Sequence, residues 1–141
     1  MANRAVHGFF KVLGVDLNAS TVIADTNTDA VNVYEEAAEV FIFGLIDAIS
    51  GTTPTCDIKM EYSPDNGTSW FDHPINRGTT NRALFSQVTT VDTETGMIVP
   101  IFGAGSGQVK IRLNIDVGGT GPNYKLTLRY AIRNAPYPSV V

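Results

Sequence analysis

The sequence has little of what enzyme active sites and metal centres are usually built from. Its 141 residues include 1 cysteine and 2 histidines, His7 and His73, and neither histidine belongs to a spacing typical of a metal site. Cys56 cannot form an internal disulfide, and it lies on the apolar side of an alternating segment, which favours a buried thiol over a nucleophile. We therefore expect no cofactor, no metal and no enzymatic activity.

Charge and long apolar segments are scarce as well. The chain has 10 Lys and Arg against 14 Asp and Glu, a net charge of −4 and a pI near 5.0, which argues against nucleic acid as a partner. The longest apolar run, residues 40–46, is far shorter than the about 20 residues that cross a bilayer. His7, Lys11 and Asp16 interrupt the apolar residues near the N-terminus, so we expect no signal peptide and no membrane partner.

Alternation of apolar and polar residues is the clearest positive signal, and it predicts strands. It is strongest over residues 109–117 and 124–133, which we expect to pair with each other across a turn at 118–122. Their apolar sides would face the core and their other sides would be basic, with Lys110, Arg112, Lys125, Arg129 and Arg133. A solvated face that opposes aggregation is favoured there over a specific anion site.

Residues 40–49 are apolar on both sides of the expected pleat. Val40, Ile42, Ile46 and Ala48 would form one side, and Phe41, Phe43, Leu45 and Ile49 the other. Such a strand is either covered on both faces within its own domain, or it presents one face to another subunit. A turn at 50–55 would end it.

The rest of the chain indicates further short strands and no convincing helix. They are expected over residues 9–17, 20–24, 31–34, 84–91 and 96–102, with polar turns at 25–29, 92–95 and 103–107. Pro100 makes the strand at 96–102 an edge or bulged strand. We predict an all-β fold, an antiparallel β-sandwich of about eight strands with jelly-roll or immunoglobulin-like connections. It forms one domain, 1–141, with an N-terminal arm at 1–8 and a C-terminal tail at 134–141.

The segment from Cys56 to Asp72 predicts a strand, a tight turn and a return strand that starts at Trp70. In the first strand, Asp57, Lys59 and Glu61 alternate with apolar residues and are expected to face solvent. The turn between this strand and the return strand is rich in Pro, Asp, Asn and Gly.

Four residues of this turn, Ser63, Asp65, Gly67 and Trp70, match the S-x-D-x-G-x-T-W pattern called the Asp-box, with Ser69 in place of Thr. The resemblance implies a structural hairpin in which the Asp side chain binds backbone amides and the aromatic ring packs over the turn. Sialidases carry several such boxes, and the single copy here does not imply a glycosidase.

The whole chain resembles small structural proteins of tailed bacteriophage virions. The features that carry this resemblance are the YSPDNGTSWFDHP hairpin, the MANRA start, the abundance of Thr, Gly and Asn, and the Pro-containing tail. The resemblance implies a capsid decoration (cement) protein, made in the host cytoplasm and located in the virion, which binds the major capsid protein or other virion proteins. A neck or tail component is the alternative. A closed homo-oligomer is expected, with a trimer as the favoured order.

Contacts with such partners are expected from exposed apolar residues, from the long loop at 72–83 and from the tail. The candidates are Phe9, Phe10, Phe41, Phe43, Leu45, Arg77, Arg82, Tyr137 and Pro138. A carbohydrate-binding or adhesin-like module, which would use Tyr62, Trp70 and Phe71, remains a second hypothesis. Against it, the alternation turns Tyr62 inward and the Asp-box makes Trp70 a packing residue.

Overall fold

A computed structural model describes residues 5–9, 11–12, 15–16, 20–33, 38–72, 89, 92–101 and 108–134. All regular structure in these ranges is β-strand, and every strand pair is antiparallel. The predicted all-β antiparallel class is therefore confirmed. The predicted strand at 84–91 and the turn at 103–107 lie outside the described residues, apart from Thr89.

Within the described residues, eight of ten strands form one sheet, and the other two, β2 and β3, pair with each other. The strands are β1 (Ala5–Phe9), β2 (Lys11–Val12), β3 (Val15–Asp16), β4 (Ser20–Val22), β5 (Thr26–Asn27), β6 (Val31–Val33), β7 (Ala38–Ser63), β8 (Phe71–Asp72), β9 (Asp92–Ile101) and β10 (Val109–Asn134). The single strand predicted over 9–17 is thus wrong, because Lys11–Val12 turns back to pair with Val15–Asp16.

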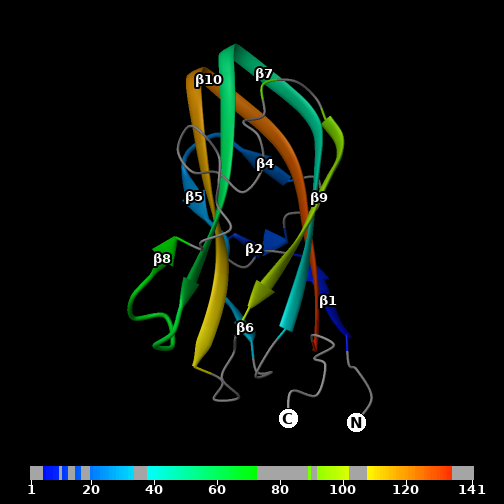
Figure 1. Cartoon of the computed structure of the whole chain (residues 1–141). Helices are drawn as coiled ribbons and strands as arrows, with labels where there is room; N and C mark the ends of the chain where they lie inside the picture. The colour runs from blue at the N-terminus through cyan, green and yellow to red at the C-terminus, as the bar shows by residue number, and fades with distance from the viewer. Residues whose placement is uncertain are drawn as a thin grey trace, which may run out of the picture.

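Two strands of 26 residues each, β7 and β10, form a ribbon that organises the molecule. They pair along almost their whole length, from Lys110 opposite Ser63 to Asn134 opposite Ala38. The ribbon rises, bends at one end of the molecule and descends again, so that its two halves form two legs (Figure 1). One leg holds residues 55–63 and 110–118, and the other holds residues 38–50 and 123–134.

This pairing corrects the predicted hairpin between residues 109–117 and 124–133. These two segments belong to one strand, and each pairs with the opposite half of β7. The predicted turns at 50–55 and 118–122 instead lie side by side and form the bend, where the register between the strands shifts. Positive φ is adopted there by Gly51, Thr53, Gly119 and Gly121. A bend of this kind needs the same residue types as a turn, which explains why both segments were predicted as turns.

Further strands border the ribbon on both sides. β1, β4, β5 and β6 pair in succession along the free side of β10, while β9 pairs with the first half of β7 and β8 with its end. Residues 5–8, predicted as part of an arm, are therefore a paired strand, and residues 92–95, predicted as a turn, begin β9. Among the described strands β9 pairs with β7 alone, as expected for the edge strand that contains Pro100.

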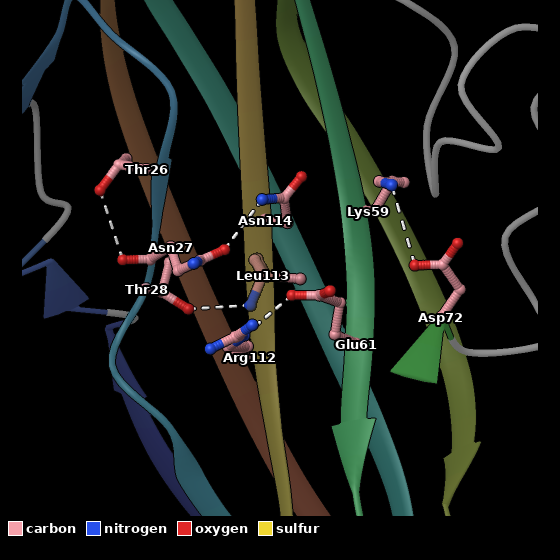
Figure 2. Close-up of polar contacts among 9 residues, drawn as sticks. All are labelled: Thr26, Asn27, Thr28, Lys59, Glu61, Asp72, Arg112, Leu113 and Asn114. Carbon is pink, nitrogen blue, oxygen red and sulfur yellow. Dashed lines mark hydrogen bonds and ion pairs between the residues drawn. The ribbon is translucent and has the colours of Figure 1, made fainter. Parts of the chain in front are cut away.

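Side chains of the segment at 25–28 supply part of its attachment to β10. The Leu113 N–H donates to the Thr28 hydroxyl and the Asn114 amide donates to the Asn27 side-chain oxygen, both at 2.8 Å (Figure 2). The Val117 N–H likewise donates to the Asp25 carboxylate at 2.8 Å. The bonds from Leu113 and Val117 satisfy backbone groups of β10 where the short strands leave gaps in the ladder, and the bond from Asn114 joins two side chains.

One hydrophobic core receives side chains from both legs of the ribbon. Ile58, Met60 and Leu113 come from one leg, and Ile42, Tyr124 and Leu128 from the other, and all are at most 2% exposed. The apolar alternation predicted for β10 is correct, since Val109, Ile111, Leu113, Ile115, Tyr124, Leu126, Leu128 and Ile132 are all buried. The two legs thus enclose the core as the layers of a sandwich do. The jelly-roll or immunoglobulin-like connections remain a prediction.

Two predicted side-chain directions on β7 are wrong. Ala48 is exposed and Ile49 packs against the core, because the register with β10 shifts between Ile46 and Ala48 and so reverses the alternation. Asp57, expected on the solvent face, is only 3% exposed. It lies opposite Asp116 in register, and burial, a hydrogen bond with Asp25 and the two neighbouring negative charges raise the pKa of Asp116.

Candidate functional site

The Asp-box hairpin has the hydrogen bonds that its motif implies. The Ser63 hydroxyl accepts from the Gly67 N–H at 2.8 Å and donates to the Asp65 carboxylate at 2.8 Å. The same carboxylate accepts from the Ser69 N–H at 2.8 Å. Asn66 and Gly67 adopt positive φ, the conformation that such a turn requires. The return strand β8 begins at Phe71, one residue later than predicted.

The Trp70 side chain packs against its own hairpin rather than standing on an open surface. Its half-buried ring lies against Gly67, where an added Cβ would be 3.8 Å from the ring, and the Arg112 guanidinium sits 4.1 Å from its centroid. Glu61 holds this guanidinium through a 2.8 Å contact between Nε and Oε1 (Figure 2). The basic side of β10 is therefore neutralised at this position by its neighbour on β7.

Removing the Asp65 carboxylate is expected to lower the melting temperature at neutral pH. The hydrogen bonds from the Ser69 N–H and the Ser63 hydroxyl lower the pKa of Asp65 below 3.8. A lowered pKa means that the ionised carboxylate stabilises the folded state above pH 3.8, and that this contribution is lost as the pH falls through the folded-state pKa. Thermal melts of Asp65→Ala and wild type should differ at pH 7 and converge in acid. Thr68→Ala, in the same turn, should melt at the wild-type temperature both at pH 7 and in acid. A difference between Asp65→Ala and wild type that persists below the folded-state pKa would contradict this role.

The most distinctive surface is the outer face of the leg that contains the first half of β7. Val40 and Ile42 are fully buried, whereas Phe43 on the opposite side is 47% exposed and Phe41 is half-buried. The rings of Phe41 and Phe43 meet edge to face, with centroids 4.2 Å apart. The prediction that this strand is apolar on both sides is correct, and the second side is only partly covered within the chain.

Strand register adds two side chains from other strands to this surface. Phe43 lies opposite Arg129 of β10, and Arg129 lies opposite Phe9 of β1. The Arg129 guanidinium is 4.9 Å from the centroid of the Phe9 ring. Half-buried Leu45 continues the row of Phe41 and Phe43 along β7. We call Phe9, Phe41, Phe43, Leu45 and Arg129 the phenylalanine face; the strands that carry it, β1, β10 and β7, are neighbours in Figure 1.

Four of the nine predicted contact residues thus share one face, and they come from two segments far apart in the sequence. The other five, Phe10, Arg77, Arg82, Tyr137 and Pro138, lie outside the described residues. Arg129 was not predicted as a contact. Its alternation with apolar residues placed it outward, but only the pairing with β1 and β7 puts two phenylalanines beside it.

Neither a cluster of metal ligands nor a reactive thiol is found among the described residues. Within these ranges no three His, Cys, Asp or Glu side chains are placed to hold a metal ion. Burial raises the pKa of the Cys56 thiol to about 12, which keeps it protonated and unreactive near neutral pH. No helix in the described part of the chain is long and apolar enough to cross a membrane. No protein-family model matches the sequence, and a search of curated proteins finds no significant match.

Proposed function

We propose that the protein is a non-enzymatic structural component of a tailed-bacteriophage virion, a capsid decoration protein that binds the major capsid protein through the phenylalanine face. The observation that carries this proposal is the exposure of Phe43 beside Phe41 on a sheet face that points away from the core. Clustered aromatic side chains on an outer surface are typical of protein interfaces, because they lose contact with water when a partner covers them.

The arrangement of the phenylalanine face supports a role in particle assembly rather than in catalysis. It lies on regular strands, so its side chains are held in fixed relative positions and need little ordering on binding. Gly96, opposite Phe43 on β9, has no side chain with which to cover the ring. As part of the proposal the protein acts as a homo-oligomer, a trimer, on the particle.

Phe43→Ala is expected to weaken binding to capsids about tenfold without lowering the melting temperature. An anchor ring at the centre of an interface contributes about 1–4 kcal/mol to binding, and about 1.4 kcal/mol corresponds to tenfold in affinity. The measurement is co-sedimentation of the purified protein with capsids of the phage that encodes it, prepared without the protein. Sedimentation velocity on the same samples gives the oligomeric state.

Phe71→Ala is the matched control, since Phe71 is 51% exposed and lies on β8, at the other leg of the ribbon (Figure 1). It should leave capsid binding unchanged. Binding to purified necks or tails in place of capsids would indicate the neck or tail component. A monomer in sedimentation that binds none of these particles would reject the proposal.

The carbohydrate-binding alternative is favoured by one observation, the exposure of Phe71. Its ring lies 5.9 Å from that of Tyr62, so two aromatic rings meet at the edge of the hairpin. Tyr62 also packs against the core, as predicted, and Trp70 is engaged by Arg112. Quenching of Trp70 fluorescence by oligosaccharides, together with an absence of particle binding, would support this alternative in place of the virion proposal.

A further inference from the structure

Three arginines on the outer side of β10 differ in what the neighbouring strand places opposite them. Arg112 faces Glu61 and Arg133 faces Glu39 in the register with β7. Both make close ion pairs, with Nε to Oε1 at 2.8 Å for the first and Nη2 to Oε2 at 2.7 Å for the second. The β7–β10 ribbon therefore supplies a carboxylate to each of these two guanidinium groups.

The third arginine, Arg129, has a phenylalanine on each side instead. Phe9 and Phe43 are its register neighbours on β1 and β7, and neither can neutralise a charge. Glu39 lies four residues before Phe43 on β7, about 13 Å away along the strand, and it already binds Arg133. The Arg129 side chain is exposed, and among the side chains that the structure places no carboxylate forms an ion pair with it.

We infer that the phenylalanine face binds a segment of a partner protein in which an Asp or Glu is flanked by apolar side chains. The carboxylate would pair with the Arg129 guanidinium, and the apolar side chains would cover Phe43 and Phe9 on either side of it. The inference rests on the proposed function in that it names the partner chemistry for the same face.

Charge and geometry select this partner over others. A planar guanidinium beside a phenyl ring is suited to hold one carboxylate with two parallel hydrogen bonds, and covering by apolar groups removes competing water. The net charge of −4 repels a polyanion such as nucleic acid, whereas a single carboxylate among apolar residues meets only the local positive charge. The two rings also offer apolar contact that a phosphate backbone cannot use.

The first test is titration of the ¹⁵N-labelled protein with two short peptides, both acetylated and amidated, that differ in one residue. One peptide carries Leu-Asp-Leu between Gly and Ser residues, and the other carries Leu-Asn-Leu. The Asp peptide should shift the Arg129 Nε–Hε resonance and the amide resonances of Phe9 and Phe43, with about tenfold higher affinity than the Asn peptide. Equal affinity for the two peptides would overturn the inference.

Variants then separate the role of Arg129 from that of positive charge in general. Arg129→Gln should abolish the preference for the Asp peptide, and Arg129→Lys should retain part of it, because the charge stays while the planar fork is lost. Lys125→Gln removes another exposed cation of the same strand and should behave as wild type. An equal loss in the Lys125 and Arg129 variants would show that only net charge matters, and would overturn the inference.

Capsid co-sedimentation distinguishes failure of this inference from failure of the proposed function. If wild type binds capsids and Arg129→Gln binds equally well, the inference fails and the proposed function stands. If wild type prefers the Asp peptide but binds no phage particle, the proposed function fails and the partner chemistry stands. Loss of the oligomer in Arg129→Gln would mean that a second copy occupies the face, which also overturns the inference.

Discussion

Gly119→Ala is expected to destabilise the protein by about 3 kcal/mol, because two independent costs coincide at this position. Gly119 adopts φ +98°, a conformation that residues with a Cβ rarely take. A Cβ built there would lie 2.5 Å from the Thr53 carbonyl oxygen and 2.8 Å from that of Thr52. Both contacts are with backbone atoms of the opposing strand, so relief requires the ribbon itself to shift at its bend. Denaturant unfolding of the variant and wild type measures the loss.

Gly121→Ala is the matched control two residues further along. Gly121 also adopts positive φ, at +59°, but an added Cβ would meet nothing within 4 Å. Only the left-handed backbone conformation then opposes the alanine, which costs about 1–2 kcal/mol. Equal losses in the two variants would show that the close approach of the two strands at Gly119 does not contribute, and would contradict the bend as described.

The same bend shows why local pattern was insufficient to predict the topology. A hairpin turn and a bend in a continuous ribbon both require glycine and positive φ, and residues 50–55 and 118–122 each provide them. What distinguishes the two is the partner of each flanking strand. Residues 109–117 could pair with residues 124–133 or with residues 55–62, and both partners alternate with the same period. Pairing between distant segments is not encoded in that period.

In the two alternating segments of β10, side-chain directions were predicted correctly. Leu113 and Leu128 face the core, and Arg112 and Arg129 face outward, as the alternation of β10 indicates. The prediction failed at Ile49, since the register shift between Ile46 and Ala48 inserts one residue into the alternation. Nothing in the local composition marks that shift.

The interaction face was predictable in part, for a related reason. Phe41 and Phe43 alternate with Val40 and Ile42, so an apolar outer side of that strand follows from the sequence alone. The position of Arg129 between two phenylalanines depends on the register of three strands, and no sequence period specifies it. The feature that suggests the chemistry of the partner is thus a property of strand pairing.

Both legs of the ribbon are needed to form the hydrophobic core, since neither leg encloses that core alone. Leu113 belongs to one leg and Leu128 to the other, and they are 0% and 1% exposed within the same cluster. Removing buried atoms from either leg should therefore destabilise both. Trp70 is the only tryptophan, so its fluorescence reports on the leg that carries the hairpin, whereas far-ultraviolet circular dichroism reports on the whole sheet.

Leu113→Ala and Leu128→Ala are each expected to lower the free energy of unfolding by about 3 kcal/mol, the usual cost of a buried cavity of this size. Because the legs share one core, Leu128→Ala should shift the fluorescence midpoint of the distant Trp70 as far as it shifts the dichroism midpoint. Ile23→Ala, at a side chain that is 63% exposed, should stay within about 0.5 kcal/mol of wild type. A Leu128→Ala variant that shifts the dichroism transition while the Trp70 midpoint stays in place would mean that the legs unfold separately, contrary to one cooperative domain.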